Sequence, residues 1–228
     1  MVLEILNNLD WSVLTNALLS IIPALICITI HELSHGFTAY KLGDRTAKNM
    51  GRLTLNPIKH IDIFGLVMMV IFKFGWAKPV PVDMRNFKRP KTGMAITAIA
   101  GPLSNVILAI VAMFAYGLVF TALGGYTATG AALLIRDALQ GVAYLSVALA
   151  VFNLVPIPPL DGSKVLFSFF PDSAYGYILR YERFGIIALI LILNTSAFSK
   201  TIGAVTMELY NRIFAVAQMS FELVNRRF

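Results

Sequence analysis

The segment Ile26–Tyr40, ICITIHELSHGFTAY, places two histidines and a glutamate at the end of a long apolar run. On a helix, residues four apart share a face, so His31 and His35 can both reach one metal ion. Glu32 lies one position further round, where it can hold a reacting water without being a ligand. This is the His-Glu-x-x-His pattern of zinc hydrolases. Residues 13–30 carry no charge, which predicts a metal centre inside a membrane.

The composition is that of a membrane protein. Hydrophobic residues make up 57% of the 228 residues, charged residues only 14%, and the mean hydropathy is +0.74. Soluble domains average about 25% charged residues, so this chain lacks the polar surface that a water-soluble globule needs. We therefore expect one integral-membrane domain, 1–228, with little material outside the bilayer. Three histidines are too few for a site built from many imidazoles.

The net charge of +7 is unevenly distributed. Eleven of the nineteen lysines and arginines lie between Lys41 and Lys91, together with only three acids. Basic loops beside membrane segments mark the cytoplasmic side, so we expect the active site to be accessible from that side of the membrane. His31 and His35 would lie within about 6–14 Å of that end of their helix. Apolar runs flank the basic cluster, so we expect no nucleic-acid partner.

The apolar segments predict an all-α fold, a polytopic bundle of four to six transmembrane helices. A span requires roughly 20 residues, and the segments that meet this length are 12–40, 92–123, 134–155 and 177–198. The tail, 201–228, has apolar residues at helical spacing opposite a charged face. This pattern indicates an amphipathic interfacial or packing helix, and a candidate contact for a homodimer.

Two irregular features are expected in 41–91, between the first two core helices. Residues 61–74 are mostly apolar but too short for a comfortable span, which indicates a re-entrant or interfacial segment. Residues 76–87, WAKPVPVDMRNF, alternate valine with proline, which predicts a short β ribbon at a sheet edge. Such an edge could receive an unwound peptide as an added strand, and a surface hairpin without a role is an equal alternative.

The second expected helix contains GPLSN at Gly101–Asn105. Gly101 and Asn105 are four residues apart and share a face, so another helix could approach at Gly101 beside the Asn105 amide. The alternative is a packing notch with one interhelical hydrogen bond.

The third expected helix ends in FNLVPIPPLDG, Phe152–Gly162, where three prolines must unwind it. Asp161 directly follows the break. Two histidines, one carboxylate and an open fourth position make a catalytic zinc arrangement, so Asp161 is a candidate ligand. It could equally cap the helix that follows. We expect His60 to be neutral and hydrogen-bonded in the turn 56–62, outside the metal site.

HELSH at 31–35, GPLSN at 101–105 and FNLVPIPPLDG at 152–162 together resemble the site-2 protease family. The three motifs occur in this order, each on an apolar segment. Members of that family are intramembrane zinc metalloproteases. The basic stretch 51–65, followed by WAKPVPV, resembles a small prokaryotic branch without PDZ or CBS domains.

The resemblance implies that His31, His35 and Asp161 bind one Zn²⁺ and that Glu32 is the general base. Asn105 would stand near the site and hold the substrate or the oxyanion. The implied function is the hydrolysis of peptide bonds in transmembrane segments of protein substrates, which is regulated intramembrane proteolysis. Two alternatives remain: a catalytically silent zinc-binding transporter or chaperone, and a membrane zinc hydrolase with a non-peptide substrate. A base beside the ligands argues against the silent protein.

Overall fold

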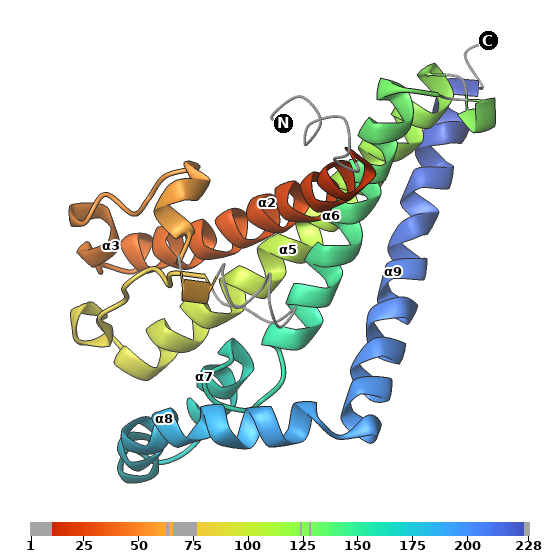
Figure 1. Cartoon of the computed structure of the whole chain (residues 1–228). Coiled ribbons are helices and arrows are strands. Elements are labelled where there is room, and N and C mark those ends of the chain that lie inside the picture. The colour runs from red at the N-terminus through yellow and green to blue at the C-terminus, as the bar shows by residue number, and fades with distance from the viewer. Residues whose placement is uncertain (1–10, 63, 66–76, 124, 128, 226–228) are drawn as a thin grey trace, which may run out of the picture.

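The computed structural model describes residues 11–62, 64, 65, 77–123, 125–127 and 129–225, and within them the chain is all-helical (Figure 1). The long helices are α2 (Trp11–Lys41), α5 (Pro90–Ala122), α6 (Ala131–Asn153), α8 (Asp172–Leu193) and α9 (Ser196–Asn225). The short helices are α3 (Thr46–Asn49), α7 (Asp161–Phe167) and the 3₁₀ turns η1 (Pro57–His60), η2 (Met84–Asn86) and η3 (Gly125–Thr127).

Three described helices are long and apolar enough to cross a membrane: Ile21–Lys41 of α2, α5 and α6. A fourth span exists only if Phe184–Leu193 and Ser196–Leu223, which are bent by 83° against each other, count as one. The described residues therefore contain three or four candidate spans. They match the lower end of the expected four to six only if the bent pair is one span.

The expected membrane helix 177–198 is not continuous, because α8 ends at Leu193 and α9 begins at Ser196. Side chains at the junction donate back to the last turn of α8, to carbonyls that also accept backbone N–H groups. The Asn194 amide donates to the Ile190 carbonyl at 2.8 Å, and the Thr195 hydroxyl donates to the Ile192 carbonyl at 2.7 Å. Such local bonds compete with helix continuation. Figure 1 shows α8 ending at the foot of α9, from which α9 turns away.

Small side chains bring α2, α5, α6 and α9 together. A Cβ atom on Gly117 of α5 would collide with Ser220 Oγ and the Ala217 carbonyl of α9. The core around this contact is made mainly of small residues, among them Cys27, Ala109, Ala112, Ala143, Val147 and Ala217. Large apolar side chains face outward instead, such as Ile22, Leu103, Ile107, Val111 and Leu191. Small residues inside and large ones outside are expected where lipid is the solvent.

The described part of the predicted tail 201–228, residues 201–225, lies in α9, which packs along α5 and α6 (Figure 1). Its apolar face is therefore used within the chain. Pairing of two copies through this helix stays a prediction.

The predicted β ribbon is wrong for the described residues, which contain no strand. Residues 77–83 have irregular backbone, and η2 follows them. Pro79 and Pro81 have no N–H to donate, so this segment cannot supply consecutive rungs of a ladder. The expected re-entrant segment, 61–74, lies mostly outside the described residues.

Buried side chains, rather than a partner strand, hold this segment against the end of α2. The Arg52 guanidinium is 7% exposed and donates to the Lys78 carbonyl at 2.7 Å and to the Pro79 carbonyl at 3.2 Å. The Lys78 N–H donates to the His60 carbonyl at 3.0 Å. One end of the segment is thereby fixed.

Asp44 fixes the other end. Its carboxylate has no exposed surface and accepts the Asp83 N–H at 2.8 Å and the Asn86 amide at 2.8 Å. The backbone N–H and the hydroxyl of Thr46 also donate to it. Burial raises the pKa of Asp44, but the hydrogen bonds outweigh burial and hold the pKa below its usual value.

Asp44→Asn should lower the free energy of unfolding by about 1–3 kcal/mol at neutral pH, because a neutral amide replaces a charged acceptor. A carboxyl group whose pKa falls on folding stabilises the protein above its unfolded pKa of about 3.9 and loses this effect as pH falls through the folded value. The stability gap between parent and variant should therefore hold near neutral pH and shrink below about pH 4. Thermal unfolding in detergent across this pH range measures the gap.

The exposed Asp137 supplies a matched control, and Asp137→Asn should leave the unfolding temperature unchanged. A gap for Asp44→Asn that persists undiminished into acid would contradict the assigned role of the Asp44 charge.

Candidate metal centre

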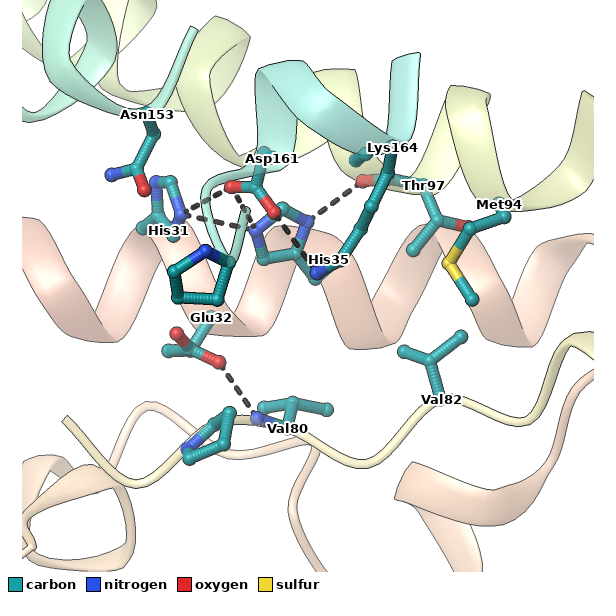
Figure 2. A pocket seen from close by; sticks show the side chains of 13 residues that line it. His31, Glu32, His35, Val80, Val82, Met94, Thr97, Asn153, Asp161 and Lys164 are labelled. Carbon is teal, nitrogen blue, oxygen red and sulfur yellow. Dashed lines mark hydrogen bonds and ion pairs between the residues drawn. The ribbon is translucent and has the colours of Figure 1, made fainter. Parts of the chain in front are cut away.

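His31, His35 and Asp161 converge in a buried cluster between α2 and the start of α7 (Figure 2). Asp161 Oδ2 lies 3.1 Å from Nε2 of each histidine, and the two Nε2 atoms are 3.0 Å apart. Zinc–nitrogen bonds of about 2.0–2.1 Å in a tetrahedral site separate ligand atoms by about 3.3 Å. The three donor atoms are thus spaced nearly as a tetrahedral ion requires.

Hydrogen bonding leaves the Nε2 atom of His35 available as a ligand. His35 Nδ1 lies 2.7 Å from the Thr97 carbonyl oxygen, which can only accept, so Nδ1 carries the proton. A neutral His35 therefore directs a bare lone pair at the Asp161 carboxylate, and two lone pairs at this distance repel unless a cation lies between them. Two imidazoles and a carboxylate are also the donor set of catalytic zinc. The residues present fit a zinc ion.

The proline-rich break delivers Asp161 to this position. After α6 ends at Asn153, the chain turns and α7 begins at Asp161. Leu160 is the N-cap residue, and α7 has no side-chain cap, so the capping role is not the one observed for Asp161. Gly162 allows the turn to close, because a Cβ atom there would collide with the Leu154 carbonyl.

GPLSN borders the cluster from α5. A Cβ atom on Gly101 would collide with His35 Nε2 and would lie 2.7 Å from His31 Cε1, so only glycine leaves room for both rings. One turn further along, the fully buried Asn105 places its Nδ2 atom 3.4 Å from His31 Nδ1. Gly101 and Asn105, which were expected to share one face of this helix, thus both lie against the histidines.

Glu32 lies on the open side of the cluster, in a cavity of about 390 Å³ that the three candidate ligands also line. Its Oε2 atom accepts the Val80 N–H at 2.7 Å (Figure 2). Val80 lies between two prolines and carries the only N–H of residues 79–81. Val80 and Val82 form one wall of the cavity. The segment fixed by Arg52 and Asp44 is therefore a wall of the site.

Sequence reasoning missed several residues that line this cavity, namely Met94, Thr97, Asn153 and Lys164. The Lys164 ammonium lies 3.5 Å from Asp161 Oδ1, and its side chain is 30% exposed. Lys164 follows Asp161 by three residues, so helical spacing alone could have identified it. Asn153 ends α6 and donates its amide to the Leu149 carbonyl at 3.0 Å. Asn153 is the second residue of the FNLVPIPPLDG motif, and this motif is the sequence signal that could have identified it.

His60 lies outside the candidate cluster in the described part of the chain. Its ring is 2% exposed, and Nε2 lies 2.9 Å from the Thr54 carbonyl oxygen, to which it donates. The hydrogen bond joins the turn 56–62 to the residues before it.

The sequence model of Peptidase family M50 matches residues 119–193. A relative from Bacillus subtilis, "Putative zinc metalloprotease YwhC", is 39% identical over 181 residues, which are 77% of this chain and 80% of that protein. This chain belongs to peptidase family M50. The resemblance to site-2 proteases, which make up that family, is thereby confirmed.

Further M50 relatives are more distant. "Putative zinc metalloprotease Rip2" of Mycolicibacterium smegmatis is 27% identical over 180 residues, 77% of this chain and 66% of that protein. "Zinc metalloprotease MJ0392" of Methanocaldococcus jannaschii is 28% identical over 177 residues, 77% of this chain and 40% of that protein. No solved structure matches the chain. The chain is a zinc metalloprotease of family M50, and its His-His-Asp cluster is consistent with the His-Glu-x-x-His pattern.

Gly101→Ala should weaken zinc binding, because the added methyl group occupies space that His31 and His35 need. Overpacking of this kind costs about 1–3 kcal/mol, or roughly 5–150-fold in affinity. Chelator competition with the purified protein measures the change.

Gly203→Ala is the matched control, since a Cβ atom at Gly203 of α9 meets nothing within 4 Å. This variant should bind zinc like the parent. Equal affinities of parent and Gly101→Ala would show that Gly101 does not limit the approach of the rings.

Proposed function

We propose that this protein is an intramembrane protease that hydrolyses peptide bonds in transmembrane segments of protein substrates, as a single domain with one zinc ion. The observation that carries the proposal is the depth of the cluster. His31 and His35 lie on the candidate span Ile21–Lys41, ten and six residues before its end. At 1.5 Å per residue this is roughly 15 and 9 Å along the helix. A peptidase site at that depth favours substrates that are themselves in the membrane.

The chemistry follows from the groups around the cavity. Zinc held by His31, His35 and Asp161 would supply a Lewis acid that activates water and polarises a peptide carbonyl. The Val80 hydrogen bond occupies Oε2 of Glu32, so Oε1 can take the proton of the attacking water. As the water oxygen bonds to the carbonyl carbon and the C–N bond breaks, Glu32 returns this proton to the leaving amine.

Water would reach the site from the basic side of the molecule. The wall that contains Val80 and Val82 belongs to the loop 41–91, which carries eleven of the nineteen basic residues. By the positive-inside rule this loop is cytoplasmic. The relatives are bacterial and archaeal, which supports a prokaryotic cell membrane. A substrate helix must unwind locally, because its amides are engaged in their own hydrogen bonds. Docking of the unwound substrate along residues 76–87 stays a prediction.

Glu32→Gln should keep the zinc and lose cleavage, because the amide preserves the shape of the side chain but cannot accept the proton. The loss should be about 10²–10⁴-fold, the usual contribution of a general base. The assay incubates purified parent and variant with single-span membrane proteins and determines zinc per chain in parallel. Asp161→Ala should lose both zinc and cleavage.

Glu208→Gln, a change of the same type at an exposed position on α9, should cleave like the parent. Equal cleavage by Glu32→Gln and the parent would refute the mechanism. Zinc-loaded parent protein that cleaves no membrane-spanning substrate but hydrolyses lipids would favour the non-peptide alternative, and a parent with neither activity would favour the silent zinc protein.

A further inference from the structure

Only one of the two polar side-chain atoms of Asn105 contacts the metal cluster. Its side chain is fully buried on α5, and its Nδ2 atom lies 3.4 Å from His31 Nδ1. Its Oδ1 atom is buried and has no hydrogen-bond partner among the described residues. A buried amide oxygen without a donor is costly, so the side chain is expected to use this atom.

The orientation of His31 determines what Asn105 faces. His31 Nε2 lies 3.0 Å from His35 Nε2 and 3.1 Å from Asp161 Oδ2, so Nε2 is the ligand atom. A neutral imidazole that binds through Nε2 carries its proton on Nδ1, which is therefore a donor. The Asn105 NH₂ group is also a donor. As oriented, the two groups oppose each other, and the amide oxygen stays unused.

A half-turn of the amide removes the opposition between the two donors, and the NH₂ group then takes the buried position that had no partner. The oxygen and nitrogen of an asparagine are nearly the same size, and their assignment follows from hydrogen bonding. With the two atoms exchanged, Oδ1 accepts the His31 Nδ1–H, and the buried oxygen has its donor.

The second histidine supports this arrangement. His35 Nδ1 donates at 2.7 Å to the carbonyl of Thr97, which lies on α5 like Asn105. Thr97, Gly101 and Asn105 are spaced at i, i+4 and i+8, so they form one stripe along α5. The stripe then offers an acceptor for His35, space for both rings, and an acceptor for His31.

We propose that Asn105 is a positioning residue that accepts the His31 Nδ1–H and holds Nε2 toward the metal. The inference rests on the proposed zinc site and replaces the expectation that Asn105 holds the substrate or the oxyanion. Asn105 is completely buried and is not among the residues that line the cavity. In the described part of the chain, its hydrogen-bonding contact with the metal site is the one with His31.

Asn105→Leu and Asn105→Asp test the proposal. Leucine has a similar shape but no acceptor, and zinc affinity should fall about 10–100-fold, as is usual when a group that orients a metal-bound histidine is lost. Aspartate keeps an acceptor at the same place and should bind zinc at least as tightly as the parent. Chelator competition measures affinity, and the visible spectrum of the Co²⁺-substituted protein should shift in Asn105→Leu only. Cleavage per zinc-loaded chain should stay within about threefold of the parent, since no transition-state contact is lost.

Ser146→Ala is the matched control, because it removes another buried polar side chain, the partner of Cys27, without touching the cluster. It should leave zinc affinity unchanged. Thermal unfolding of the zinc-free proteins shows which variants fold. If Asn105→Leu does not fold, ¹⁵N spectra of histidine-labelled, zinc-loaded parent decide the question: a protonated, hydrogen-bonded Nδ1 on His31 is expected, and its absence would overturn the proposal.

Two results separate this inference from the zinc site on which it rests. Parent protein that binds no zinc would overturn both. Parent and Asn105→Leu with equal zinc affinity, but slower cleavage per zinc in the variant, would overturn the positioning role alone and favour contact with the oxyanion. Equal weakening in the leucine and aspartate variants would also overturn it, because the acceptor would then be irrelevant.

Discussion

The close approach of Asp161 Oδ2 to two imidazole nitrogens is the contact on which the rest of the structure depends. All three atoms are acceptors when the site is ready to bind metal, and the three residues are almost completely buried. Such a cluster is stable only around a cation, and only if the helices beneath it hold each ring in place. The glycine of α5 and the unwound end of α6 are the structural conditions for that contact.

The catalytic side of the cluster depends on a second constraint, the immobilisation of a short irregular segment. Arg52 and Asp44 hold its two ends through buried charge-assisted hydrogen bonds. Between them, Val80 donates to Glu32 and makes the segment a wall of the cavity. Glu32, the proposed general base, thus lies on α2 with the two histidines, while its carboxylate is oriented by the loop.

Lipid as solvent explains the arrangement of polar groups. Large apolar side chains cover the outside of the spans, and small residues allow close packing inside. Within the bundle each strongly polar group needs a partner, because lipid offers none. Thr97 and Asn105 meet this need for the two histidines from one face of α5. The helix face that packs against the two histidines therefore also supplies their hydrogen-bond partners.

Local spacing determined much of this protein from the sequence alone. Two histidines at i and i+4 share a helix face wherever that helix lies, and long apolar runs predict spans, so α2, α5 and α6 followed directly. By spacing alone Asp161 was ambiguous between ligand and cap, because it lies 130 residues from His31 and no periodicity spans that distance; the family resemblance implied the ligand role. The tertiary structure brings Asp161 into the cluster, as the resemblance implied, and it alone decided that 77–83 is anchored by side chains rather than paired as a strand and that Asn105 lies behind His31. These outcomes depend on how separate helices register against one another, which local pattern does not encode.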